Sequence, residues 1–149
     1  MEEVVCELPD YNPPSEEVQE ILRRYRKIAV VGLSTKPERD SYRVARYLME
    51  NGFDITPVNP GHKEILGKRC YASLKDIPYE IEVVDIFLNP KRIPPVVDQA
   101  IEIGAKVIWM QLGLAHNESA KKARNAGIQV VMNMCIMQEF EKMKKNQML

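Results

Sequence analysis

The amino-acid sequence predicts an α/β fold in which a doubly wound, mostly parallel sheet carries helices on both faces. Short, continuous apolar runs recur along the chain, as is typical of strands buried on both sides. They occupy residues 27–32, 53–58, 83–88, 106–112 and 128–134. Stretches with apolar residues at helical spacing separate most of these runs. Because strand and helix alternate almost throughout, right-handed crossovers and a parallel sheet are expected.

The chain begins with a polar, proline-rich segment, residues 1–14, which we expect to form an extended arm. A helix is predicted over residues 15–26, because Ser15 is a favourable N-cap and acidic residues fill the first turn. Its apolar stripe consists of Val18, Ile21, Leu22 and Tyr25.

Between the first two strands, a polar loop over residues 33–40 precedes the next helix. Asp40 or Ser41 is expected to cap this helix, and Gly52 is expected to end it. The second strand then closes at Asn59-Pro60-Gly61, a sequence typical of a turn.

The rest of the chain continues the alternation. Residues 65–71 give a weaker strand signal, and residues 73–77 predict a single helical turn. Longer helices are predicted over residues 94–103, over residues 118–125 and from Cys135 onward. No internal repeat, low-complexity tract or linker interrupts the sequence, so we expect one domain over residues 15–149.

Composition excludes several classes of function. Lys plus Arg and Asp plus Glu are 21 each, so the net charge is zero, whereas nucleic-acid-binding proteins normally carry a basic excess. No run approaches the roughly 20 apolar residues that span a bilayer, and the start does not resemble a secretory signal. Cys6, Cys70 and Cys135 form no metal-binding cluster. We expect a cytoplasmic protein with neither a nucleic acid nor a membrane as partner.

A ligand site is expected outside the carboxyl ends of the strands, where the strand order reverses. The segments that meet there are Gly32 to Ser41, Val58 to Gly61, Phe87 to Pro90 and Gln111 to Gly113. The first of them favours a phosphate, because Gly32 permits close approach and the following helix offers unpaired amides. Lys36 and Arg39 can add charge-assisted hydrogen bonds.

The same loop argues against two common phosphate ligands. A dinucleotide fingerprint needs G-x-G-x-x-G and an acidic residue at the tip of the second strand. Here Gly32 stands alone, and Val58-Asn59-Pro60 carries no acid. The P-loop pattern is absent as well.

Several ordered motifs together resemble the small bacterial and archaeal CoA-binding domain proteins, a family related to the CoA-binding domain of succinyl-CoA synthetases. The resemblance covers roughly residues 20–140. It rests on Val30-Val31-Gly32-Leu33-Ser34, Lys36-Pro37-Glu38-Arg39-Asp40-Ser41-Tyr42, Pro57-Val58-Asn59-Pro60, Gly104-Ala105-Lys106, Trp109-Met110-Gln111-Leu112-Gly113, Ala126-Gly127, Val130-Val131-Met132, Cys135 and Glu139.

The resemblance implies a Rossmann-like fold with coenzyme A lying across the strand tips. The pyrophosphate is expected at Gly32, Leu33 and Ser34 and at the helix start, Ser41 and Tyr42. The adenosine end is expected near Val58, Asn59, Pro60, Phe87 and Leu88.

This chain departs from the family pattern at two places. Relatives often have Phe-Arg where Phe87-Leu88 stands and Asp-Arg-Cys where Asn133-Met134-Cys135 stands. The contacts of those arginines are therefore missing, and Lys91 or Arg92 is the candidate to replace them.

Some of these residues also have a purely structural interpretation. Ser34, Ser41 and Asn59 are as well suited to turns and caps as to a ligand. Cys135 stands where a strand gives way to a helix, a position that favours the thiolate form and allows a mixed disulfide with the CoA thiol. The alternative is that Cys135 is a small buried hydrophobe. His62 and His116 fall in predicted loops and are expected at the surface.

We therefore expect non-catalytic binding of coenzyme A or an acyl-CoA as the function, with coenzyme A as the cofactor. An NAD(P)-dependent oxidoreductase and a regulatory subunit that presents its bound ligand to another protein are the alternatives. A homodimer and an unidentified protein partner both stay open.

Overall fold

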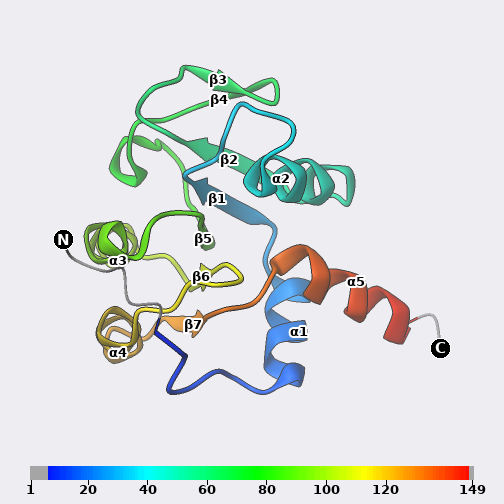
Figure 1. The fold of residues 1–149 in the computed structure, drawn as a ribbon, viewed down its shortest axis with the longest axis vertical. Helices are drawn as coiled ribbons and strands as arrows, with labels where there is room; N and C mark the ends of the chain where they lie inside the picture. Colours follow the sequence, from blue (N-terminus) through cyan, green and yellow to red (C-terminus); the bar gives the residue numbers. More distant parts are fainter. Residues whose placement is uncertain (1–6, 148–149) are drawn as a thin grey trace.

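A computed structural model describes residues 7–147 of the chain, and its centre is a parallel five-stranded sheet of order β2-β1-β5-β6-β7. Figure 1 shows the strands descending from β2 to β7 through the middle of the molecule. The strands are β1 (Lys27–Val31), β2 (Asp54–Val58), β5 (Val83–Ile86), β6 (Val107–Met110) and β7 (Gln129–Val131). The predicted α/β class with a doubly wound parallel sheet is confirmed.

Helices cover both faces of the sheet, as expected. On the right of Figure 1 lie α1 (Ser15–Arg24), α2 (Asp40–Glu50) and α5 (Ile136–Gln147). On the left lie α3 (Ile93–Glu102) and α4 (Asn117–Asn125). Alternate strand residues enter the two cores, so that Val30 and Trp109 face α1, α2 and α5 while Ala29 and Ile108 face the other helices. Within residues 7–147, no helix is long and apolar enough to cross a membrane.

Four of the five strands end one to three residues earlier than the apolar runs predict, whereas β2 ends at Val58 as predicted. The run 83–88 shortens to Val83–Ile86, because the chain turns where the Phe87 carbonyl meets Gly32. Phe87 and Leu88 therefore lie beyond the sheet, at its carboxyl edge, and not within a strand.

The weak strand signal over residues 65–71 corresponds to a small antiparallel hairpin, β3 (Glu64–Ile65) and β4 (Lys68–Arg69). Its turn residues, Leu66 and Gly67, both have positive φ, as a tight hairpin turn requires. Tyr71 then pairs with the edge strand β2, since its amide donates to Pro57 O. Short 3-10 helices follow at η1 (Leu74–Asp76) and η2 (Pro90–Arg92).

The described part of the N-terminal arm, residues 7–14, lies along α4 and the end of β7. The Asn12 side chain donates to Met132 O and accepts from Met132 N, both at 2.8 Å. Asn117 holds the arm at three further points, through Glu7, Leu8 and Asp10. The hydrogen bonds to Met132 occupy backbone groups immediately beyond the edge strand.

Two predicted helix caps are wrong. Pro14 occupies the N-cap position of α1, and Ser15 is the first helical residue. Arg39 occupies the N-cap position of α2, so neither Asp40 nor Ser41 caps that helix. In both places the backbone turns into the helix one residue or more before the expected cap, and neither helix has a side-chain cap.

Candidate functional site

The strand order reverses between β1 and β5, because the chain leaves β1 for β2 on one side and later returns to β5 on the other. Such a switch point leaves a crevice at the carboxyl ends of the two strands. Gly32 follows β1 there with φ +86°, and a Cβ on it would lie 2.2 Å from Phe87 O. Only glycine lets the two strand ends approach this closely.

The loop between β1 and α2, residues 32–39, is held in place by side chains. Ser34 N donates to Ser41 Oγ at 2.9 Å, and Lys36 N donates to Ser34 Oγ at 3.0 Å. Asn59 Nδ2 donates to Leu33 O at 3.0 Å. Both serine hydroxyls act as acceptors here, which leaves their own protons available to a ligand.

The N-terminus of α2 faces the same crevice. Arg39 at the N-cap makes no side-chain capping bond, and the amides of Asp40, Ser41 and Tyr42 have no acceptor among the described residues. Unpaired amides at a helix start, together with the positive end of the helix dipole, favour an anion.

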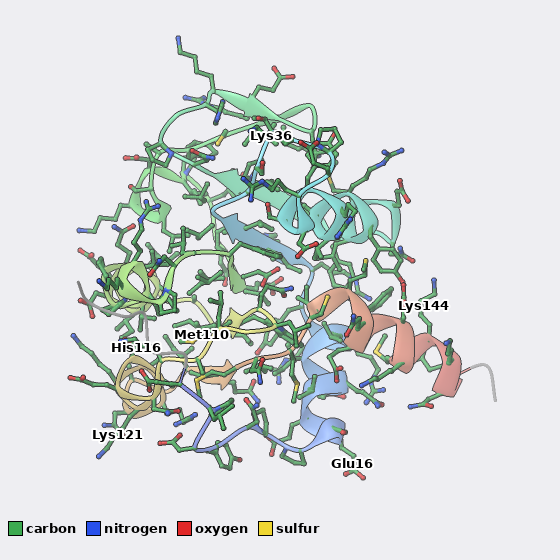
Figure 2. All side chains as sticks on the ribbon, viewed as in Figure 1. Glu16, Lys36, Met110, His116, Lys121 and Lys144 are labelled. Carbon is green, nitrogen blue, oxygen red and sulfur yellow. The ribbon has the colours of Figure 1, made fainter. Side chains whose placement is uncertain are left out.

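Cationic side chains surround this helix start. Lys36 and Arg39, both predicted, line the crevice and are exposed, and neither forms an ion pair with a described residue. Figure 2 shows Lys36 on the loop beside α2. Arg43 and His62 line it as well, and the Arg43 guanidinium pairs with Asp40. The electrostatics therefore suit a phosphate or pyrophosphate.

A pocket of about 730 Å³, the larger pocket, opens from this helix start across the sheet edge toward α5. One half is polar and cationic, formed by the β1–α2 loop and the first turn of α2. The other half combines amide and apolar groups from the segment after β6 and from the start of α5. This second half is lined by Gln111, Leu112, Leu114, Cys135, Met137 and Gln138.

Gln111 and Cys135 both lie at the start of α5. Gln111 is 4% exposed, and its Oε1 accepts from Ile136 N at 3.1 Å, which caps the helix. Cys135 precedes that amide, is 8% exposed and lines the larger pocket. Its carbonyl accepts from Glu139 N, as expected of a residue that opens a helix. Whether Cys135 exchanges with a CoA thiol stays a prediction.

A second pocket of about 550 Å³, the smaller pocket, lies on the other side of the crevice toward α3. It shares Gly32, Asn59, Phe87 and Leu88 with the larger pocket. Apolar residues and backbone of the β2 end, η1 and α3 form its walls, and Lys91 and Arg92 of η2 stand among them. The two pockets therefore adjoin one another along these four residues.

The structure brings most of the predicted site residues together. Those lining one or both pockets are Gly32, Ser34, Lys36, Arg39, Ser41, Val58, Asn59, Pro60, Phe87, Leu88, Gln111 and Cys135. Leu33, Tyr42 and Gly113 line neither. Leu33 is fully buried, so it is not exposed to the crevice. Asn59 uses Nδ2 on Leu33 and Oδ1 on Gly61, so its amide already shapes the crevice.

Sequence reasoning missed several wall residues. Arg43 is four residues after Arg39, and this helical spacing could have placed both on one side. His62 and Met137 gave no such signal, because their approach to the crevice depends on how the hairpin segment and α5 pack. His116, expected only at the surface, is the N-cap of α4 and accepts from Ser119 N (Figure 2).

Of the two other cysteines, Cys70 lines neither pocket. Cys6 lies outside the described residues. Cys70 is buried, its Sγ donates to Asn59 O at 3.4 Å, and burial raises the pKa of its thiol. Among residues 7–147, no cluster of His, Cys, Asp and Glu is placed to hold a metal ion.

Comparison with known proteins points to one family. The family model described as a CoA binding domain matches residues 26–141. The uncharacterized protein YneT of Bacillus subtilis is 39% identical over 125 residues, 84% of this chain and 93% of that protein. A hypothetical protein from Pyrococcus horikoshii has the same fold, with a TM-score of 0.88, 49% identity, and coverage of 97% of this chain and 99% of that one.

A larger enzyme shares part of the sequence. The alpha subunit of acetate–CoA ligase [ADP-forming] I from Pyrococcus furiosus is 34% identical over 95 residues. The match covers 60% of this chain but only 21% of that subunit.

Proposed function

Because the chain belongs to the CoA-binding domain family, we propose that it binds coenzyme A at the carboxyl ends of its parallel strands and performs no catalysis of its own. The observation that carries the proposal is the pair of adjoining pockets at the sheet edge, of which the larger pocket is lined by the uncapped N-terminus of α2. A long ligand with a diphosphate in its middle suits this arrangement.

In this proposal the diphosphate binds the free amides of α2, with Lys36 and Arg39 as its charged partners. The adenosine end lies in the smaller pocket, where Lys91 and Arg92 can reach its ribose phosphate. The pantetheine arm crosses the larger pocket toward Cys135. Each part of the ligand then meets groups of matching chemistry, which favours coenzyme A over a bare phosphate.

The non-catalytic part of the proposal is supported by how little of the ligase this chain represents. Only 21% of the Pyrococcus furiosus subunit aligns with it, so the shared segment corresponds to one part of that enzyme. We also propose a cytoplasmic, reducing location, which suits the free thiols of Cys70 and Cys135.

Calorimetry with coenzyme A and with NAD tests the ligand. We expect coenzyme A to bind much more tightly, because Asn59 stands where an NAD site places an acid for the ribose diol. NAD binding of equal or greater strength would contradict the proposal. Native mass spectrometry of the purified chain adds the stoichiometry, and a ligand-free chain held in complex with a second protein would favour the regulatory-subunit alternative.

A further inference from the structure

The half of the larger pocket next to α5 is lined by apolar side chains as well as by the Gln111 and Gln138 amides. Leu112, Leu114 and Met137 line it, beyond the cationic half that suits the diphosphate. Leu112 is 62% exposed, one of four exposed large apolar side chains within residues 7–147. An exposed leucine at a pocket wall indicates a surface that an apolar ligand group can cover.

Gln111 adds a directed hydrogen-bond donor to this half. Its Oε1 is held by Ile136 N, which fixes the orientation of the side-chain amide. Its Nε2 makes no hydrogen bond to a described residue and is not among the fully enclosed unpartnered atoms, so it is open to the pocket. An amide nitrogen that has no acceptor in the described part of the protein and is open to the pocket is available to donate to a ligand or to water.

The position of this donor relative to Cys135 suggests which ligand atom it meets. Gln111 contacts the amide of Ile136, the residue next to Cys135. If the ligand sulfur lies at Cys135, the neighbouring Nε2 is suitably placed for an oxygen on the carbon bonded to that sulfur. In an acyl-CoA that oxygen is the thioester carbonyl, whereas free CoA carries only a thiol there.

We propose that this half of the larger pocket is an acyl site, so that the protein binds acyl-CoA thioesters with an apolar acyl chain in preference to free coenzyme A. The thioester carbonyl accepts a hydrogen bond from Gln111 Nε2, and the acyl chain covers Leu112, Leu114 and Met137. The inference rests on the proposed function, because it requires that the CoA part bind as described above.

Calorimetry with four ligands tests the acyl site: CoA, acetyl-CoA, hexanoyl-CoA and the thioether S-hexyl-CoA. Each methylene that leaves water strengthens binding up to about fourfold, so hexanoyl-CoA should bind at least about tenfold more tightly than acetyl-CoA. S-hexyl-CoA has the same chain without the carbonyl and should bind several-fold more weakly than hexanoyl-CoA.

The outcomes separate the two proposals. Tight CoA binding with no gain from the hexanoyl chain overturns the acyl site and leaves the proposed function standing. Failure of all four ligands to bind overturns the proposed function, and the acyl site with it. Equal binding of hexanoyl-CoA and S-hexyl-CoA overturns the role of Gln111.

Two variants locate the effect. Leu112→Ser should abolish most of the hexanoyl gain, measured as the ratio of hexanoyl-CoA affinity to CoA affinity in the same variant. Leu8→Ser, another exposed leucine that lines neither pocket, is the matched control and should keep the wild-type ratio. Gln111→Glu keeps an acceptor for Ile136 N but replaces the donor. This variant should weaken the binding of hexanoyl-CoA more than the binding of S-hexyl-CoA. An unchanged melting temperature would show that α5 stays in place. A hexanoyl gain that survives Leu112→Ser, or an equal loss in both leucine variants, overturns the assignment.

Discussion

Gly32 combines two requirements that no other residue type meets. Its φ is +86°, and any Cβ would lie 2.2 Å from Phe87 O. Gly32→Ala should therefore cost the left-handed backbone penalty of about 1–2 kcal/mol plus the cost of separating the ends of β1 and β5. Urea unfolding measures the loss.

Gly52→Ala is the matched control, because Gly52 has φ +88° and a Cβ added to it would have no neighbouring atom within 4 Å. The free energy of unfolding of Gly52→Ala should therefore fall only by the left-handed backbone penalty. Equal losses in the two variants would mean that the strand ends separate without cost.

Arg39 lies at the N-cap of α2, exposed beside the free amides. Arg39→Ala should weaken CoA binding by about 1–3 kcal/mol, because a charged hydrogen bond to phosphate is lost. The melting temperature of the ligand-free protein should hardly change, since an exposed charge contributes little to folding. Calorimetry on Arg39→Ala and on Arg46→Ala, whose arginine pairs with Glu50 on the same helix, provides the comparison. Unchanged affinity in Arg39→Ala would make Arg39 a surface charge only.

We predict that Cys135, which lines the larger pocket, undergoes thiol–disulfide exchange with a CoA disulfide. Its thiolate would attack one sulfur and release the other half as CoA thiolate, so one disulfide replaces another with no net oxidation. We expect an intact-mass adduct of one CoA that a reducing agent removes. Cys135→Ser should abolish it, whereas Cys70→Ser and Cys6→Ser should not. An adduct that persists in Cys135→Ser would leave Cys135 as a structural residue.

The described part of the N-terminal arm, residues 7–14, is fastened by Asn12 to Met132, just beyond the end of β7. Asn12→Ala removes both hydrogen bonds to Met132 and leaves a buried amide and carbonyl without partners. We expect a loss of roughly 1–3 kcal/mol in the free energy of unfolding. Asn146→Ala, near the end of α5, should change it little. A negligible effect of Asn12→Ala would mean that water replaces the arm at this edge.

Helix α2 contributes to the candidate site because its N-terminus has no side-chain cap. Its N-cap carries no capping side chain, so the first amides stay free, and Ser41 supports the preceding loop instead of the helix. Helix α5 is the opposite case, since Gln111 caps its first amide. One helix start is thus open to an anion, while the other fixes an amide group in the pocket.

Stability of the whole molecule should depend on pH through Asp85. This residue lies in β5 between Val30 and Trp109, fully buried, and neither carboxylate oxygen has a partner among the described residues. Burial raises the pKa of Asp85 well above its usual value. The folded state therefore keeps a proton that the unfolded chain releases near about pH 4. The contribution of Asp85 to stability is fully present below about pH 4 and falls as pH rises toward the folded-state pKa.

Asp85→Asn removes this titration. We expect the difference in unfolding free energy, wild type minus variant, to decrease as pH rises from about 4 to about 8 in urea unfolding experiments. A difference that stays constant over this range would mean that Asp85 titrates alike in both states.

Local sequence patterns are enough to predict the sheet, the helices on its two faces and the place of the candidate site, because burial on both faces and helical spacing are visible in short stretches of chain. They also identified Gly32, Lys36 and Arg39, whose position after the first strand is a local feature. Tertiary packing decided that Asn59 fastens the β1–α2 loop, that Gln111 caps α5 and that His62 and Met137 reach the pocket. These contacts join residues far apart in the chain, and their partners follow from how the elements pack, which no local pattern encodes.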